Sequence, residues 1–245
     1  MDSGYYAACT GLIARTEALE IAANNLANAN TSGFRAKHET FHSLLAQSTG
    51  TRLTDINRAV NDYGVLGSAR VDLSQGNLER TGNVLDLAIE GRGFFAVQTA
   101  GGTRYTRDGS FQQTRDGYLV TNGGDRVLGE NGAAIRMLDG TADISGEGTI
   151  SVSGALAGKL KIVEFVPGTQ LESVGDSYYS APSNSVVAPS ASRVRQGMVE
   201  GSNVNPVASA VGLIALQRHA EMLQRALSTF HSEFNRIAAE ELPRV

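Results

Sequence analysis

The fold is decided by the stretch LIALQRHAEMLQRALSTFHSEFNRI, residues 213–237. Side chains three and four positions apart lie on one face of a helix, and a repeat of about 3.5 residues favours a second helix beside it. The apolar residues keep that spacing throughout, at Leu213, Leu216, Ala220, Leu223, Leu227, Phe230, Phe234 and Ile237. We therefore predict a long helix from about Pro206 to Glu240, with the proline in its first turn. Asn203 or Asn205 is the expected N-cap.

We call such a row of residues along one helix face a seam. The other end of the chain carries a second seam of the same spacing. It runs through Cys9, Leu12, Thr16, Leu19, Ala23, Leu26 and Asn30. The segment lacks proline and is rich in Ala, Leu and Glu, which favours a helix from Tyr5 to Asn28, and the following Gly33 suits a helix stop. Two helices with matching seams predict a coiled coil between the two ends of the chain.

Four asparagines gather at the end of this first helix, namely Asn24, Asn25, Asn28 and Asn30. Asparagine is unfavourable inside a helix but can form caps or register-fixing hydrogen bonds. The cluster is either a frayed helix end or a set of polar contacts across subunits. The predicted assembly interface consists of Leu12, Leu19, Ala23, Asn24, Asn25, Leu26, Asn28, Leu213, Leu216, Ala220, Leu223, Leu227, Phe230, Phe234 and Ile237.

The middle of the chain has the pattern of short β-strands. Strand candidates are residues 85–90, 95–99, 149–152, 159–165 and 185–187. Asn-Gly and Asp-Gly pairs supply the positive φ angles that tight hairpins need. Four such pairs follow one another, at residues 108–109, 116–117, 122–123 and 131–132. This succession predicts an antiparallel meander with short strands.

Together these patterns predict an α+β fold, with paired terminal helices and a central antiparallel all-β module. The expected regions are an N-terminal coiled-coil helix with its following segment (1–45), an extended connector (46–81), the central β domain (82–192), and a connector with the C-terminal helix (193–245). Residues 31–54 are compatible with a short second helix, and residues 193–205 resemble a plain return connector.

Composition excludes several classes of protein. The net charge is -4, whereas nucleic-acid binding needs clustered positive charge. No stretch approaches the roughly 20 apolar residues of a membrane helix, so we expect no lipid insertion. The first residues lack the basic start and apolar run of a cleaved signal peptide. Cys9 is the single cysteine and cannot form an internal disulfide.

Candidate chemical sites are weaker than their structural alternatives. His38 and His42 could share a helix face, but no third metal ligand follows at a suitable spacing. Asp86 and Glu90 alternate on a strand and are better explained as a solvated face than as an acid–base pair. The Gly-x-Gly at 91–93 lies between strands, where the dinucleotide fingerprint needs a helix. The sequence therefore predicts no enzyme, no cofactor and no metal.

Three motifs, taken together, resemble the bacterial flagellar rod, hook and hook-associated axial proteins. The first is ANNLAN at 23–28 with TSGFR at 31–35. The second is TGNVLDLAIEGRGFF at 81–95, continued by YTRDGSF at 105–111, GYLVT at 117–121 and VLG at 127–129. The third is EGSNVNP at 200–206 with LQR at 216–218. They stand in the family's order at the start, centre and end of the chain.

The resemblance implies a structural subunit of the basal-body rod, because the chain has no large inserted domain as in the hook. It implies an inner coiled coil with an outer β module, stacked helically into a hollow shaft that transmits torque across the periplasm. Partners would be copies of the chain, other rod subunits and the flagellar type III export apparatus, which explains a missing cleaved signal peptide. Within the family the opening residues favour the proximal rod, with the distal rod as the alternative.

Two other classes stay open at this point. One is a soluble adaptor that docks a partner through one helix, and the other is an enzyme on a β scaffold. An adaptor would keep one stable terminal helix, whereas a rod subunit would have two interdependent ones that are loose until assembly covers them.

Overall fold

The computed structural model describes residues 2–38, 41–42, 65–66, 69–138, 140–175, 177–189 and 191–241. The chain divides into two compact units. We call them the helical unit, made of Met1–Leu26, Lys37–Arg70 and Pro206–Val245, and the β module, made of Ala27–Ala36 and Val71–Asn205. The boundary at 82–192 expected for a central domain stays a prediction, and the β module includes residues on both sides of it.

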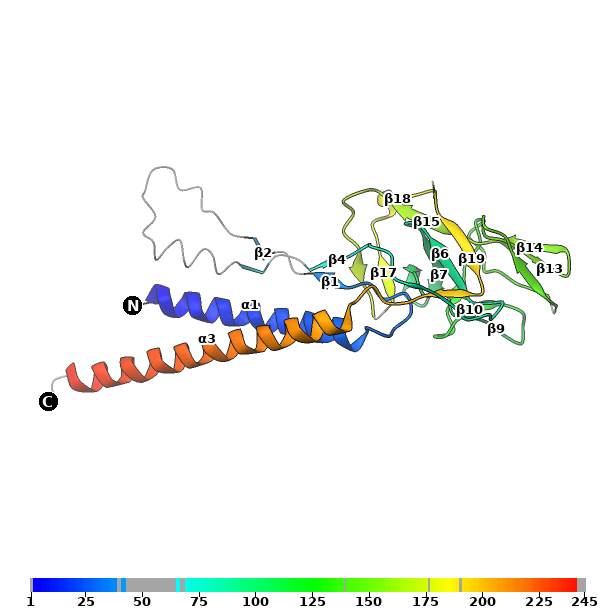
Figure 1. Cartoon of the computed structure of the whole chain (residues 1–245). Helices are drawn as coiled ribbons and strands as arrows, with labels where there is room; N and C mark the ends of the chain where they lie inside the picture. The colour runs from blue at the N-terminus through cyan, green and yellow to red at the C-terminus, as the bar shows by residue number, and fades with distance from the viewer. Residues whose placement is uncertain are drawn as a thin grey trace. The chain divides into compact units, whose positions relative to one another are not determined.

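Two long helices belong to the helical unit, and both were predicted. Helix α1 spans Asp2–Ala27 and helix α3 spans Pro206–Glu241 (Figure 1). Pro206 begins α3, as its fixed φ angle and missing N–H allow. Asn203 uses its side chain elsewhere in the β module, so it does not serve as the N-cap. No helix among the described residues is long and apolar enough to cross a membrane.

The segment after α1 differs from the expectation of a second helix. Its described parts are extended: β1 is Lys37–His38, β2 is Phe41–His42, β3 is Val65–Leu66 and β4 is Arg70–Val71. β1 pairs with β4, and β2 pairs with β3 in antiparallel fashion. A helix was therefore wrong for residues 31–38 and 41–42: residues 31–36 are turns and irregular backbone, and 37–38 and 41–42 pair with strands much later in the sequence. The remainder of the expected helix, residues 39–40 and 43–54, lies outside the described residues.

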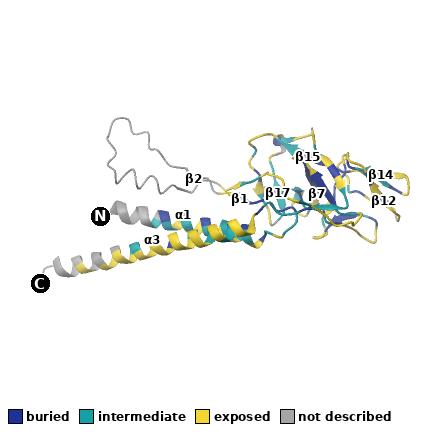
Figure 2. Ribbon diagram, viewed as in Figure 1, coloured by how far each residue is buried: buried dark blue, intermediate teal, exposed yellow. Residues whose placement is uncertain are grey.

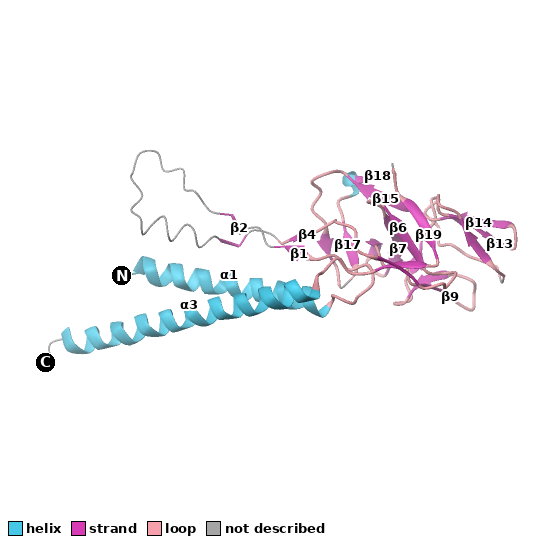
Figure 3. Ribbon diagram, viewed as in Figure 1, coloured by secondary structure: helices cyan, strands magenta, loops and turns pink. Residues whose placement is uncertain are grey.

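The β module contains many short strands, as the closely spaced turn signals predicted (Figure 3). Their bounds are β5 Leu78–Arg80, β6 Leu87–Glu90, β7 Phe94–Thr99, β8 Gly102–Thr106, β9 Phe111–Gln113, β10 Leu119–Thr121, β11 Arg126–Val127, β12 Ala142–Ile144, β13 Thr149–Val152, β14 Ala155–Lys159, β15 Ile162–Phe165, β16 Glu172–Ser173, β17 Tyr178–Ser180, β18 Val186–Val187, β19 Arg193–Gln196 and β20 Met198–Glu200. A short 3-10 turn, η1, covers Ser183–Ser185. The segment 193–205, expected to be a connector, thus contributes two strands.

The sheet is antiparallel but is not a simple meander. Its main path runs β16-β17-β8-β7-β11-β10-β9, and β15 pairs with β7 beside it. Hairpins account for β7–β8, β9–β10 and β10–β11, while β11 and β17 join strands that are distant in sequence. β19 pairs with β6, and β20 pairs with β5. Turn residues predict hairpins but carry no information about such distant pairs.

Strand β7 is largely buried (Figure 2), and its side chains contribute to two hydrophobic clusters. Phe95 and Val97 point into the main cluster, whereas Phe94 packs with Tyr179 in a second cluster. Ala96 is also buried. The main cluster comprises Leu87, Ile89, Phe95, Val97, Phe111, Leu119, Val127, Ile135, Met137, Ala142, Ile144, Ile150, Val152, Leu160, Ile162 and Val194. Val194 shows that the C-terminal strand β19 completes this core.

Candidate functional site

The predicted seam of α3 coincides with the least exposed side of the helix. Leu213, Leu216, Leu223 and Leu227 are half-buried, and Ala220 is buried with 7% exposure. The side chains of Phe230, Phe234 and Ile237 lie outside the described residues. For its first half, therefore, the 3-4 spacing identified the covered face of α3.

On α1 the buried stripe is displaced from the predicted seam. Gly11, Ala14 and Ala18 are buried. The leucines of the predicted seam, Leu12, Leu19 and Leu26, are half-buried, as is Cys9, whereas Thr16, Ala23 and Asn30 are exposed. Large side chains dominate a hydrophobic pattern, so the small residues of the neighbouring stripe were overlooked.

Two of the asparagines at the end of α1, Asn25 and Asn28, form hydrogen bonds within the chain. Nδ2 of Asn25 donates to the Lys37 carbonyl at 2.8 Å, and Oδ1 accepts the Lys37 N–H at 2.9 Å. This reciprocal pair returns the chain alongside α1. The carboxamide oxygen of Asn28 accepts the Thr31 hydroxyl at 3.0 Å, while Asn24 is half-buried. Contacts of these residues across subunits stay a prediction.

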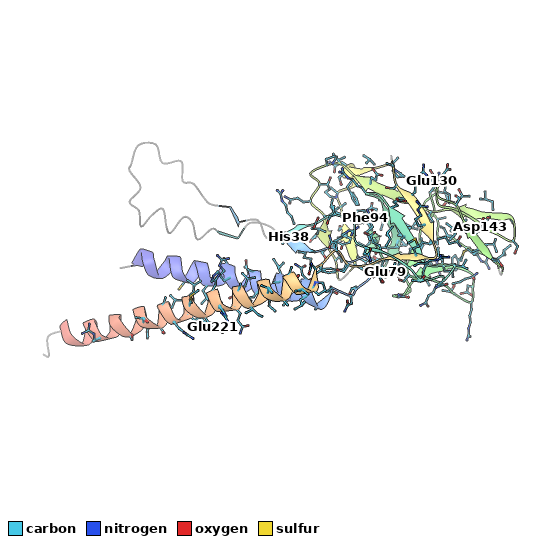
Figure 4. The ribbon with its side chains drawn as sticks, viewed as in Figure 1. His38, Glu79, Phe94, Glu130, Asp143 and Glu221 are labelled. Atoms are coloured by element: carbon cyan, nitrogen blue, oxygen red, sulfur yellow. The ribbon has the colours of Figure 1, made fainter. Side chains whose placement is uncertain are left out.

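A second apolar stripe on α3 is exposed. Val207, Val211, Ile214 and Met222 have exposed fractions of 75%, 64%, 53% and 57%. At about 100° per residue these positions centre on the face opposite the seam. The polar residue Glu221 also lies on the exposed part of this helix (Figure 4). α3 thus has two apolar faces, of which one is uncovered.

The β module contains a buried charged cluster, Arg35, Arg107 and Glu200, which we call the clasp. Nη2 of Arg35 donates to Oε1 of Glu200 at 2.5 Å, and Nη1 of Arg107 donates to Oε2 at 2.9 Å. The side chains are 0%, 1% and 0% exposed. Arg107 also donates to the carbonyls of Ile89 and Gly91, and its guanidinium lies 4.9 Å from the centre of the Phe94 ring.

Backbone contacts draw the chain together around the clasp. The Gly33 N–H donates to the Glu200 carbonyl at 2.7 Å, and the Ala36 N–H donates to Oδ1 of Asn203 at 2.7 Å. The Gly76 N–H donates to Oε1 of Glu200 at 2.8 Å. Gly33 has a φ of +69°, and a Cβ there would collide with the backbone of Arg107 and Asp108. Only glycine fits so close an approach at positive φ.

Burial shifts the pKa of one clasp residue, Arg107, and that of the neighbouring Tyr179. Desolvation lowers the pKa of Arg107 to about 10, although the nearby Glu200 carboxylate opposes this shift. Desolvation also raises the pKa of Tyr179 to about 12. The Tyr179 hydroxyl accepts the backbone N–H of Arg35 at 3.0 Å. Such buried charges are costly unless they are paired, so the clasp requires all its members in place.

The clasp residues lie within the three sequence motifs, but the sequence predicted no role for them. Arg35, Arg107 and Glu200 each stand within two residues of a glycine, at 33, 109 and 201. An ionisable residue next to glycines that permit close backbone approach was the available signal. Nothing in the spacing of these three residues indicated that they meet.

Three family models match successive parts of the chain. The description "Flagella basal body rod protein" matches residues 6–35, "Flagellar hook protein FlgE/F/G D1 domain" matches 88–152, and "Flagellar basal body rod FlgEFG protein C-terminal" matches 195–239. Arg35, Arg107 and Glu200 fall one in each matched range. The clasp therefore joins the three segments by which the family is recognised.

Curated relatives match over the whole chain. A flagellar basal-body rod protein FlgF of Caulobacter vibrioides is 34% identical over 100% of both chains. A flagellar basal-body rod protein FlgG of Agrobacterium fabrum is 34% identical over 91% of this chain and 93% of its own. A FlgF of Mesorhizobium japonicum is 33% identical over 90% of both. The chain belongs to the family of flagellar basal-body rod proteins, which are structural subunits and not enzymes.

Proposed function

We propose that this protein is a subunit of the proximal part of the flagellar rod, and that it assembles through its two terminal helices with copies of itself and with other rod subunits. The observation that carries the proposal is the pair of apolar faces on α3. One face is needed for a partner within the chain, and the other is left for a partner outside it.

The inner face of this arrangement would be a coiled coil of α1 with α3. Both helices belong to the helical unit, and each has a stripe of reduced exposure. The stripe on α1 is made of small residues, Gly11, Ala14 and Ala18, while the stripe on α3 is made mostly of leucines. Small residues opposite leucines let two helices approach closely, which supports the pairing.

The outer face would be the contact between subunits. Val207, Val211, Ile214 and Met222 lie on one exposed face of α3, where Arg218 separates Met222 from the other three, and a monomer would leave these apolar side chains in water. On α1, Ile13 is 61% exposed. Covering one large apolar side chain is worth roughly 1.5–3 kcal/mol. A few such residues for each subunit, repeated along a helical stack, suffice to hold a shaft together.

The same proposal includes the route and the place of assembly. The subunit would leave the cell through the flagellar type III export apparatus without a cleaved signal peptide and would join the rod in the periplasm. There the stacked helices would line a hollow shaft that transmits torque. The proximal position is supported by the relative named FlgF that matches over 100% of both chains, and the distal rod is the alternative, as relatives named FlgG match over nine-tenths.

The proposal is tested with the double variant Val211→Asp, Ile214→Asp in the exposed stripe. We expect it to abolish rod assembly in a strain that lacks the native subunit, while circular dichroism of the purified chain stays unchanged. The matched control is Gln224→Asp, an exposed polar position on the same helix, which should assemble normally. Normal rods in the double variant would refute assembly through this face. Complementation of strains that lack either rod protein then distinguishes proximal from distal.

A further inference from the structure

The clasp joins stretches of the chain that are far apart in sequence. Arg35 follows α1, Arg107 follows β8, and Glu200 ends β20 shortly before α3. Gly33 and Ala36 contact Glu200 and Asn203 through hydrogen bonds of 2.7 Å each, and the Asn203 N–H donates to the Phe34 carbonyl at 3.4 Å. The segment that leaves α1 and the segment that enters α3 therefore run beside each other within the β module.

We propose that the clasp is a positioning device that closes only when the segments 33–36 and 200–203 are both seated within the β module. Arg35 on the N-terminal segment and Glu200 on the C-terminal segment hold each other in place. Arg107 also binds Glu200 and is itself held by the carbonyls of Ile89 and Gly91. The device sets where the chain enters and leaves the two terminal helices. It concerns the folding of the single chain and goes beyond assembly into the rod.

The charges of the clasp make this coupling selective. Two guanidinium groups share one carboxylate in a site that is almost completely buried. Removing Glu200 leaves two like charges side by side without compensation, which is the most costly outcome. Removing Arg35 leaves the neutral pair of Arg107 and Glu200, with further bonds from Arg107 to the carbonyls of Ile89 and Gly91. The cost is therefore expected to be asymmetric.

A purely packing role predicts a different order of effects. Glu200→Gln conserves volume and would be nearly silent if the site were held by shape alone. Arg35→Met removes a large polar head and would then be the more damaging change. If charge pairing holds the site together, Glu200→Gln is instead the more damaging of the two changes. Charge pairing also predicts that Arg35→Met rescues Glu200→Gln, because the second change removes one of the two uncompensated cations.

The experiment is amide hydrogen exchange on the full-length purified chain, resolved by peptide, together with urea unfolding. Five amides report on closure: Gly33, Arg35 and Ala36 on the N-terminal segment, and Gly201 and Asn203 on the C-terminal one. In Arg35→Met we expect exchange at Gly201 and Asn203 to rise by at least about tenfold, although the change lies on the other segment. The control is Glu90→Gln, which breaks the exposed Glu90–Arg195 pair and should leave all five amides as in the native chain.

The unfolding midpoints complete the test. We expect the Glu200→Gln variant to unfold at the lowest urea concentration, Arg35→Met at a higher one, and the double variant above Glu200→Gln alone. If Glu200→Gln does not fold at all, the double variant should still recover a cooperative transition. Native exchange at Gly201 and Asn203 in Arg35→Met, or a double variant no more stable than Glu200→Gln, would overturn the proposal. Rod assembly is not a readout, so failure here leaves the proposed function standing.

Discussion

The β module and the helical unit differ in which side chains they bury and which they expose. The module buries even charged groups, and the clasp gives its carboxylate a partner on each oxygen. The helix α3 leaves four large apolar residues of one face more than half exposed. The β module also exposes apolar side chains such as Leu138 and Leu156, but it buries two hydrophobic clusters of its own, whereas the exposed apolar residues of α3 lie on one face of one helix. The difference indicates which part of the molecule is a self-contained fold and which part assembles.

The largest expected effect is the loss of assembly when a charge enters the helix seam. Leu223→Asp places a carboxylate on the covered face of α3, and Leu19→Asp places one on the half-buried predicted seam of α1, beside its buried stripe. Burying an unpaired charge is prohibitive, so we expect no rods and no motility. The β module belongs to the other compact unit, so its thermal transition should stay as in the native chain. Normal motility in either variant, or a lost module transition, would remove the contrast between the two regions.

A change at Gly33 should damage the module instead of the helices. In Gly33→Val the new side chain meets the backbone of Arg107 and Asp108 at a positive φ angle, so we expect a loss of roughly 3 kcal/mol or more in the free energy of unfolding. Gly82 is the matched control, since its φ is +77° and an added Cβ meets nothing within 4 Å. Gly82→Val should cost only the backbone strain. Equal losses in both variants, measured by urea unfolding, would show that the close approach at Gly33 is unimportant.

Between pH 10 and pH 12 the buried Tyr179 should lower the free energy of unfolding of the module, an effect that the lowered pKa of Arg107 opposes. Desolvation raises the pKa of Tyr179 from 10.0 to about 12, so between these values the unfolded chain loses a proton that the folded chain keeps. Stability from this group is complete below pH 10 and is lost as the pH rises through 12, at about 1.4 kcal/mol per pKa unit. Tyr178 is shifted in the same direction by burial. In Tyr179→Phe the free energy of unfolding should fall less steeply between pH 10 and pH 12 than in the native chain. An unchanged pH dependence would contradict the burial of the Tyr179 hydroxyl.

Replacing the asparagines at the end of α1 should have a smaller effect, and it tests whether they act in folding of the single chain or in assembly. Asn25→Ala removes both hydrogen bonds to Lys37, at a cost of about 1 kcal/mol for each bond, and should speed amide exchange at Lys37. If the cluster also contacts neighbouring subunits, the double variant Asn24→Ala, Asn25→Ala should form rods that dissociate at lower denaturant. Rods of native stability from this double variant would limit the cluster to a role within the chain.

The smallest effect is expected at an exposed ion pair of the module. Nη2 of Arg195 lies 2.7 Å from Oε2 of Glu90, but the two side chains are 54% and 50% exposed. Water screens such a pair, so Glu90→Gln should change the free energy of unfolding by about 0–1 kcal/mol. A loss comparable with that of Glu200→Gln would mean that burial is not what distinguishes the clasp.

Much of the fold could be predicted because local patterns specify local structure. The spacing of Leu213, Leu216 and Ala220 identified α3 and its covered face, and the candidate at 149–152 coincides with β13. Asp116-Gly117 marks the turn between β9 and β10, where Gly117 has a φ of +84°. In each case the physical cause lies within a few residues, which is why the sequence reveals it.

The errors concern contacts between distant residues. The strands β19 and β20 had no distinctive pattern, because they are defined by pairing with β6 and β5. The buried stripe of α1 consists of small residues such as Ala14 and Ala18, which add little to a hydrophobic pattern. The clasp was missed because Arg35 and Glu200 meet only after the chain has closed on itself. A pattern of a single sequence does not contain that distance.

The central claim is that the β module is complete in the single chain while the helical unit waits for partners. Peptide-resolved hydrogen exchange on the dilute native chain measures this contrast directly. The account predicts slow exchange in 31–36 and across 71–205, and fast exchange in most of α1 and α3 until rods form. Helices as strongly protected as the module in the dilute chain would contradict it, because they would then need no second subunit.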